Sequence, residues 1–315
     1  MEFTVRAASG THDYPLPIDH SLSWQDNTAR LEIGHVPEGH IIIPSFSQLP
    51  DQGRLPSFSF TLTAADHHPV QLQRVPAKNK NDCSRGGSDE SISTHIDCFH
   101  THRPQEEVTI SVELDEPPLQ SSLMVVSIRP LQMEVALPTQ SNIRLEPPEA
   151  ISQMSAPKDI RQRICSPTAT AMCLSTYQNI GDWLTIVDKC ADPLSRAFGV
   201  WPLAIRAANG FGVHGAVEAL VTWDAAYEAL HSGHPIVCSI NFAKGELTGA
   251  PLTQTSGHLV VLYGFDEKHA YVMDPAADSG ERVQRRYDLS EFSQAWLHER
   301  GAAYIFSGHA HTLSH

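Results

Sequence analysis

Basic residues are scarce in this sequence: 22 Lys and Arg stand against 36 Asp and Glu, a formal net charge of −14 over 315 residues. Nucleic acids and anionic membranes select for clustered Lys and Arg, so we expect neither as a partner. No apolar run approaches the roughly 20 residues that cross a bilayer, so we expect no membrane span. The first residues lack a basic stretch followed by an apolar one, so we expect a cytoplasmic protein unless a leader was already removed.

Paired cysteine spacing is also missing. The six cysteines are scattered along the chain, unlike the dense framework of a small secreted domain, so we expect free thiols. They are Cys83, Cys98, Cys165, Cys173, Cys190 and Cys238. The composition, 41% apolar and 18% charged, is that of a globular protein, and the length suits two domains.

The first half of the chain has no long helical periodicity. Short runs rich in β-branched and aromatic residues recur instead, separated by Pro, Gly and Asp. They are His40–Pro44, Ser57–Thr63, Val108–Leu114 and Leu123–Arg129. This pattern predicts a β-sandwich or jelly-roll-like domain over residues 1–146. The run Arg144–Ser155 contains a Pro pair and no apolar period, so we interpret it as a linker that enters a second domain, residues 147–315.

The second half changes character, with helical segments first and short strands after them. The expected helices are a segment that starts just after Cys165, with Pro167 in its first turn, and then residues 181–190, 223–230 and 289–297. The expected strands are residues 235–241, 258–263, 270–273, 283–287 and 303–307. This order predicts helices packed on an antiparallel sheet, so the fold class of the whole chain is α+β.

Three residues of the second half suggest nucleophilic catalysis. Cys165 stands immediately before a predicted helix, where free N–H groups and the helix dipole favour a thiolate. His258 follows Gly257 at the head of an apolar strand, and Asp274 ends the next strand. Adjacent strands of a hairpin can place this imidazole and this carboxylate side by side, so that Asp274 orients His258 as the base for Cys165. The alternative is a buried thiol, a surface imidazole and a turn carboxylate with no common role.

The stretch from Gln153 to Phe306 resembles the bacterial papain-like cysteine peptidases related to the double-glycine leader peptidases of bacteriocin exporters. The segments that carry the resemblance are SQM around Gln153, CSPTATAM from Cys165, FGVWPLAIRAA from Phe198, GHPIVCSI from Gly233, GELTGAPLTQTSGHLVVLYGF through His258, VMDPAA through Asp274 and RRYDLSEFSQAWL from Arg285. The resemblance implies a papain-like peptidase domain in which the cysteine attacks a carbonyl, the histidine moves the proton and the aspartate orients the histidine.

The same resemblance implies that a glutamine side chain before the nucleophile helps to hold the oxyanion. Two glutamines precede Cys165, and we prefer Gln153 over Gln162, because a residue three positions before the nucleophile lies too close to point its amide across a cleft. Trp201 is typical of a core aromatic, with a place in a substrate groove as the alternative.

One cluster of possible metal ligands lies in the first half. Cys98 stands among His95, His100 and His102. We interpret the segment as a single strand with His95 on the opposite face from the other three, and no second ligand pair follows at zinc-finger spacing, so we expect no metal site.

Three functions remain open from the sequence. The first is hydrolysis of a peptide or related amide bond through a thioester at Cys165, with no cofactor. The second is transfer of the same acyl group to an amine, as in transglutaminase-like relatives of the fold. The third is a non-catalytic binding protein, with the β-rich domain as its functional module.

Overall fold

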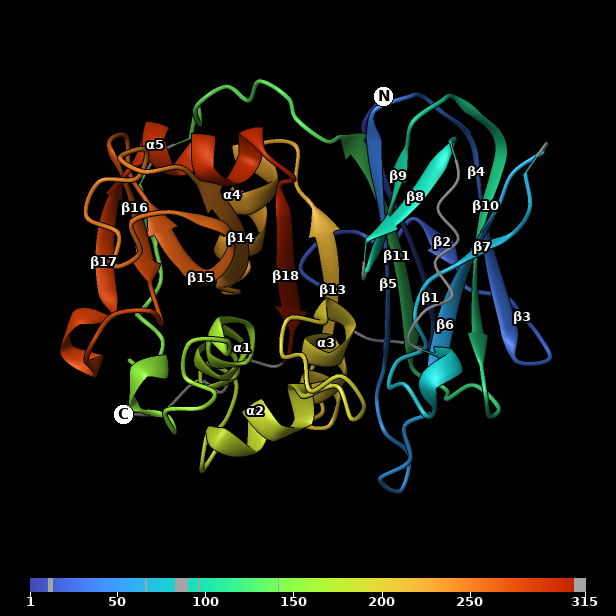
Figure 1. The fold of residues 1–315 in the computed structure, drawn as a ribbon, viewed down its shortest axis with the longest axis horizontal. Coiled ribbons are helices and arrows are strands. Elements are labelled where there is room, and N and C mark those ends of the chain that lie inside the picture. The colour runs from blue at the N-terminus through green and yellow to red at the C-terminus, as the bar shows by residue number, and fades with distance from the viewer. Residues whose placement is uncertain (11–13, 66, 83–89, 96, 141, 309–315) are drawn as a thin grey trace. The chain divides into compact units, whose positions relative to one another are not determined.

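The computed structural model describes residues 1–10, 14–65, 67–82, 90–95, 97–140 and 142–308 (Figure 1). The chain forms two compact units. Unit 1 comprises Met1–His12, Pro17–Leu131 and Ala191–Ala219, and unit 2 comprises Asp13–Leu16, Gln132–Cys190 and Leu220–His315. Helices and sheets are both present, so the α+β class is confirmed. The predicted domain boundary between residues 146 and 147 stays a prediction, because the units are defined by contacts and not by independent folding.

Unit 1 contains two sheets of mainly antiparallel strands. The strands are β1 Phe3–Ser9, β2 His20–Ser21, β3 Trp24–Gln25, β4 Thr28–Val36, β5 His40–Gln48, β6 Phe58–Thr63, β7 Val70–Gln71, β8 Ile92–His95, β9 Cys98–Thr101, β10 Gln105–Leu114 and β11 Ser122–Pro130. One sheet has the order β2-β1-β11-β5-β9-β8 and the other the order β3-β4-β10-β6-β7 (Figure 1). The four strands predicted in this half correspond to β5, β6, β10 and β11.

The apolar core of unit 1 draws on both sheets. Phe46 of β5 meets Phe58 of β6 edge-on with ring centroids 5.3 Å apart, and Phe58 meets Phe60 in the same way at 5.5 Å. Alternate side chains of each strand face this core, which is the arrangement of two sheets packed face to face. The finer prediction of jelly-roll connectivity stays a prediction.

A segment from the second half of the sequence belongs to unit 1. Residues Ala191–Ala219 carry α3 (Trp201–Asn209) and β13 (His214–Ala219), and both elements pack against β5. The first N–H of α3, on Trp201, donates to the buried Asp97 side chain at 2.8 Å. Neither element was predicted. The cap of α3 comes from a residue more than a hundred positions away, and β13 is buried on both faces, so it lacks alternation.

The polar side chains of this segment are bonded within unit 1. The buried His214 ring contacts the Ser47 hydroxyl through Nδ1 and the Ser121 hydroxyl through Nε2, each at 2.8 Å. Asn209 donates to the same Ser47 hydroxyl at 2.8 Å, and Glu218 forms an ion pair with Arg6. The strands of unit 1 therefore supply hydrogen-bond and ion-pair partners to this segment.

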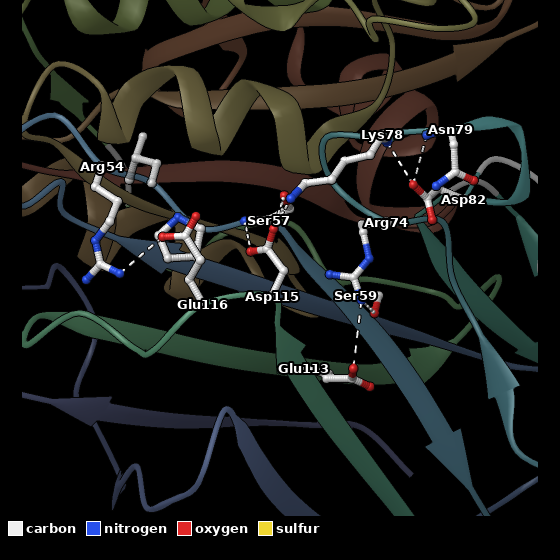
Figure 2. A network of polar contacts seen from close by, with 12 residues as sticks. Arg54, Ser57, Ser59, Arg74, Lys78, Asn79, Asp82, Glu113, Asp115 and Glu116 are labelled. Carbon is white, nitrogen blue, oxygen red and sulfur yellow. Dashed lines mark hydrogen bonds and ion pairs between the residues drawn. The ribbon is translucent and has the colours of Figure 1, made fainter.

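A polar network ties the loops of unit 1 to its strands (Figure 2). Asp115, just after β10, accepts from the Ser57 N–H at 2.7 Å and from the Ser57 hydroxyl at 3.0 Å, and it also pairs with Lys78. Burial raises the pKa of Asp115, but Lys78 and Ser57 outweigh it, so the pKa lies below its usual value. Asp82 accepts from the backbone N–H of Lys78 and Asn79, which closes the loop that carries Lys78.

The histidine-rich segment of unit 1 forms a hairpin, so the prediction of a single strand is wrong. His95 of β8 pairs with Cys98 of β9, and Ser93 pairs with His100. Because the chain reverses, His95 lies on the same face as His100, with ring centroids 4.2 Å apart. Within the described ranges, no group of three His, Cys, Asp or Glu side chains is arranged to hold a metal ion.

Unit 2 combines helices with a sheet in which β18, β14, β15, β16 and β17 are neighbours in that order (Figure 1). The strands are β12 Ile143–Arg144, β14 Ile236–Phe242, β15 Thr255–Phe265, β16 His269–Met273, β17 Gln284–Asp288 and β18 Ala302–Ser307. The helices are α1 Cys165–Leu174, α2 Leu184–Cys190, α4 Trp223–His231 and α5 Leu289–Ser293, which continues into a π-helical turn over Gln294–His298. All strands and helices predicted for this half are found. In the described part of the chain, no helix is long and apolar enough to cross a membrane.

The helix starts of unit 2 follow from their capping residues. Thr222 accepts from the Ala225 N–H and caps α4. Asp288 caps α5 by accepting from the N–H groups of Ser290 and Glu291. The Glu291 side chain does not complete a capping box, because its carboxylate accepts from Thr248 instead.

The predicted linker Arg144–Ser155 is an ordered part of unit 2. Arg144 of β12 pairs with Gly264 of β15, and the Leu145 N–H donates to the Tyr263 carbonyl at 2.8 Å. A short 3-10 turn, η2, follows over Gln153–Ser155. The prediction failed because the Pro pair suggested solvation, whereas the backbone around it finds partners on β15.

Candidate active site

Cys165 is the first residue of α1. Ile164 before it supplies no side-chain cap, so the first turn keeps free N–H groups and the positive end of the helix dipole. Pro167 stands in this first turn, where its missing N–H costs no helical hydrogen bond. The helix start therefore favours the ionised form of a thiol at this position.

The Cys165 thiol has hydrogen-bond partners from two elements. They are the ring of His258 and the backbone N–H of Leu259, both on β15, and the N–H of Ser166 on α1. Burial opposes ionisation of the thiol, but His258 and the two N–H groups outweigh it and hold the pKa of Cys165 below its usual value. The residue as a whole is partly exposed.

The register of the sheet brings His258 and Asp274 together. Val261 of β15 pairs with Met273 at the end of β16, so Asp274 comes alongside Val260. Side chains alternate along a strand, so His258 and Val260 point to the same face, and Asp274 shares it. His258 Nε2 lies 2.8 Å from Asp274 Oδ1, which leaves Nδ1 as the nitrogen that faces Cys165.

The His258 ring is buried, and Asp274 and Cys165 both stabilise its protonated form. Burial opposes protonation, but the charge and hydrogen bond of Asp274, followed by those of Cys165, raise the pKa of His258 to about 10. The raised pKa of the His258 ring and the lowered pKa of the Cys165 thiol both favour an ion pair between the two groups.

Asp274 is buried and carries three hydrogen bonds. Its Oδ1 accepts from His258 and from the Ala276 N–H, the latter at 2.9 Å, and its Oδ2 accepts from the Tyr287 hydroxyl at 2.7 Å. Burial would raise the pKa of this carboxyl, but the charge of His258 and these hydrogen bonds hold it below its usual value. The carboxylate is therefore ionised beside the imidazolium.

The other described cysteines are unlike Cys165. Cys98, Cys173, Cys190 and Cys238 are buried. Burial raises the pKa of Cys173, Cys190 and Cys238 far above the ordinary value, so these thiols stay protonated and unreactive. Cys83 lies outside the described residues.

Gln153 lies next to the segment that follows Asp274. Its backbone N–H donates to the Pro275 carbonyl at 2.9 Å, and the neighbouring Ser152 hydroxyl donates to the Ala277 carbonyl. Its side-chain amide donates to the Arg161 carbonyl at 2.7 Å, which leaves a second amide hydrogen free of that bond. The side chain is buried, and its Oε1 has no partner among the described residues.

The two other residues weighed from the sequence lie elsewhere. Gln162 is exposed at the surface, in the turn before α1. Trp201 is the first residue of α3 in unit 1 and is buried. Its place in a substrate groove stays a prediction.

Sequence reasoning missed two parts of this site. The hydrogen bond from the Tyr287 hydroxyl to Asp274 had no signal in the sequence beyond a tyrosine in a predicted strand near the end of the chain. The Leu259 N–H on the Cys165 sulfur is a backbone group, which side-chain motifs do not reveal. Together the site offers a thiol whose pKa is lowered, suited to attack on an electrophilic carbon, and a histidine whose raised pKa suits it to protonate a leaving group.

Comparison with known proteins gives a family match and a similarity to solved structures. Residues 148–304 match the Peptidase_C39 like family. A crystal structure from Bacillus anthracis, described as a C39-like peptidase, is similar at 19% sequence identity and a TM-score of 0.42, over 54% of this chain and 100% of that chain. No curated protein matches the chain.

Proposed function

Residues 148–304 belong to the Peptidase_C39 like family, and on this basis we propose that the protein hydrolyses a peptide or related amide bond with Cys165, His258 and Asp274 as its catalytic triad. One observation carries the proposal: the Cys165 thiol is partly exposed, is bonded to a buried His258 and has a lowered pKa. The other cysteines for which a pKa shift is resolved have raised values.

In the first step, the Cys165 thiolate attacks the carbonyl carbon of the substrate and a C–S bond forms. The His258 imidazolium gives its proton to the departing amine nitrogen, and the C–N bond breaks to leave a thioester. Asp274 keeps the ring oriented and balances its charge before this transfer.

In the second step, water attacks the thioester carbonyl. His258, now neutral, takes a proton from that water, the C–S bond breaks, and the Cys165 thiolate leaves as the carboxylic acid forms. The N–H of Cys165 and the free amide hydrogen of Gln153 are the donors we assign to the oxyanion of both steps. The fold that supports this chemistry is papain-like in our proposal, and the substrate is a peptide or related amide.

The experiment is a cleavage screen of the full chain on a peptide mixture from digested proteins, with products identified by mass spectrometry. We expect new peptides with free carboxyl ends, and none from Cys165→Ala. Cys190→Ala is the matched control, because it removes a buried helical thiol of the same unit whose pKa is raised. Cleavage that survives Cys165→Ala would overturn the proposal.

Two further outcomes bear on the alternatives left open by the sequence. A repeat of the screen with an added primary amine separates hydrolysis from acyl transfer, because transfer joins the acyl group to the amine as an amide, whereas hydrolysis gives only the free acid. If the chain cleaves nothing and Cys165 is no more reactive than an ordinary thiol, a binding function carried by residues 1–146 is the better account.

A further inference from the structure

Tyr287 places a buried hydroxyl against the candidate triad. It lies on β17, is fully buried, and donates from its O–H to Asp274 Oδ2 at 2.7 Å. Its ring packs parallel to that of Phe292 with centroids 6.1 Å apart, which fixes the direction of the hydroxyl. The contact is distinct from the one that His258 makes on the other oxygen of the same carboxylate.

The two carboxylate oxygens of Asp274 accept hydrogen bonds from different elements. Oδ1 accepts from His258 on β15 and from the Ala276 N–H, whereas Oδ2 accepts from Tyr287. Asp274 is 1% exposed, so its negative charge depends on these donors in place of solvent. Loss of the hydroxyl would leave one charged oxygen buried without this donor.

Tyr287 remains a donor at every working pH. Burial, followed by the negative charge of Asp274 and the hydrogen bond to it, raises the pKa of Tyr287 far above its ordinary value, against a smaller opposing effect of Arg285. The groups that face the carboxylate are therefore a permanently protonated phenol on one side and the His258–Cys165 pair on the other.

We propose that Tyr287 is a positioning residue of the triad, whose hydroxyl keeps Asp274 ionised and oriented so that Asp274 holds His258 protonated beside the Cys165 thiolate. This inference rests on the proposed function. Tyr287 reaches the reacting atoms only through Asp274, so its role differs from that of a catalytic residue.

Loss of the Tyr287 hydroxyl should change the pH at which Cys165 loses its reactivity. Without the hydroxyl, the Asp274 carboxylate is less stable, so it takes up a proton at a higher pH than in the wild type. His258 then loses its counter-charge, and the Cys165 thiolate is lost at that higher pH. The acid limb of Cys165 reactivity moves upward.

The test is the rate of Cys165 alkylation by iodoacetamide across the pH range, followed peptide by peptide with mass spectrometry. We expect Tyr287→Phe to move the acid limb up by about one pH unit, since it removes one hydrogen bond to a buried charge. Tyr263→Phe is the matched control, because its buried hydroxyl on β15 contacts Gln284 and Arg144 and not the triad. That variant should leave the limb in place.

Two further measurements distinguish a positioning role of Tyr287 from a purely structural role in packing. On a peptide cleaved by the wild type, Tyr287→Phe should lower kcat about tenfold with little change in KM. In an Asp274→Asn background, the same substitution should produce no further shift of the acid limb, because the group it acts through is gone.

The outcomes are distinguishable. The wild-type rate profile could fall at a pH well below that of a free thiol while the profile of Tyr287→Phe coincides with it. That result overturns the role of Tyr287 alone. A wild-type limb at the ordinary thiol value overturns the proposed function as well. If Tyr287→Phe does not fold, 3,5-difluorotyrosine at position 287 supplies the second variant: a stronger donor should move the limb down, and an unmoved limb counts against the proposal.

Discussion

Cys165 and Cys190 are both helical cysteines of unit 2, yet the pKa values of their thiols are shifted in opposite directions. Both lose solvation, which favours the neutral thiol. Cys165 recovers that loss through an imidazolium and two backbone N–H groups, whereas no such effect opposes burial at Cys190. The neighbours of a cysteine, and not its residue type, therefore set the direction of its pKa shift.

At the scale of single residues, the role of Gln153 is open to direct test. We predict that Gln153→Ala lowers turnover of a cleaved peptide about a hundredfold, because it removes one donor to the oxyanion. The alkylation rate of Cys165 should stay the same, because alkylation requires the ionised thiol but forms no oxyanion. Gln162→Ala is the control and should leave both unchanged. The reverse result, with Gln162 essential and Gln153 dispensable, would contradict the assignment.

Much of the site could be predicted from local sequence. A cysteine before Pro and good helix formers indicated the helix start, and a Gly-His pair followed by an Asp-Pro pair on successive strands indicated the hairpin. The Tyr287 hydroxyl could not be predicted in this way, because a tyrosine in a strand has the same pattern whether it meets a carboxylate or another ring.

At the scale of elements, the close approach of β12 to β15 depends on Gly264. A Cβ on Gly264 would lie 2.6 Å from the Ile143 carbonyl oxygen and 2.7 Å from the Arg144 Cα. These are backbone atoms, which cannot move aside as a flexible side chain could. The glycine therefore allows residues 143–145 to pair on the strand that carries His258.

We predict that Gly264→Ala lowers the free energy of unfolding by about 1–3 kcal/mol, the usual cost of forcing extra volume into a packed site. Urea denaturation measures it. Gly257→Ala is the control on the same strand, because a Cβ there meets nothing closer than the Arg300 guanidinium at 3.9 Å. Equal stabilities for the two variants would show that the backbone can adjust.

The elements that were predicted carry a local signal, and those that were missed do not. α4 and α5 begin at residues of types that commonly cap helices, Thr222 and Asp288, and both side chains do cap their helices. β13 gave no signal, since its buried run contains His214 and Glu218, which are satisfied by distant serine and arginine side chains. Partners that are distant in the sequence cannot be predicted from a local sequence pattern.

At the scale of the whole molecule, residues 191–219 fall within the family match but belong to unit 1. Their buried polar groups bond to residues 1–131: His214 and Asn209 to Ser47, and Glu218 to Arg6. A buried polar group that loses a partner costs about 1–3 kcal/mol, so the loss of these contacts removes a large part of the stability of a typical domain.

We therefore predict that residues 147–315 expressed alone do not melt cooperatively, as followed by circular dichroism, although they contain the proposed triad. Co-expression with residues 1–146 should restore a folded complex in which Cys165 is alkylated as in the intact chain. If the isolated fragment melts cooperatively and shows the same Cys165 reactivity, the first 146 residues are dispensable for its folding, and this part of the account is wrong.

The central claim is that Cys165 is a thiolate paired with the His258 imidazolium. The most direct test is the pH dependence of Cys165 alkylation by iodoacetamide in the intact chain, with His258→Ala beside it. We predict a wild-type midpoint well below the value of about 8.5 for a free thiol. The midpoint should rise in His258→Ala, because burial raises the pKa of Cys165 and His258 no longer lowers it. A wild-type midpoint at or above that of a free thiol, or one that His258→Ala leaves unchanged, would contradict it.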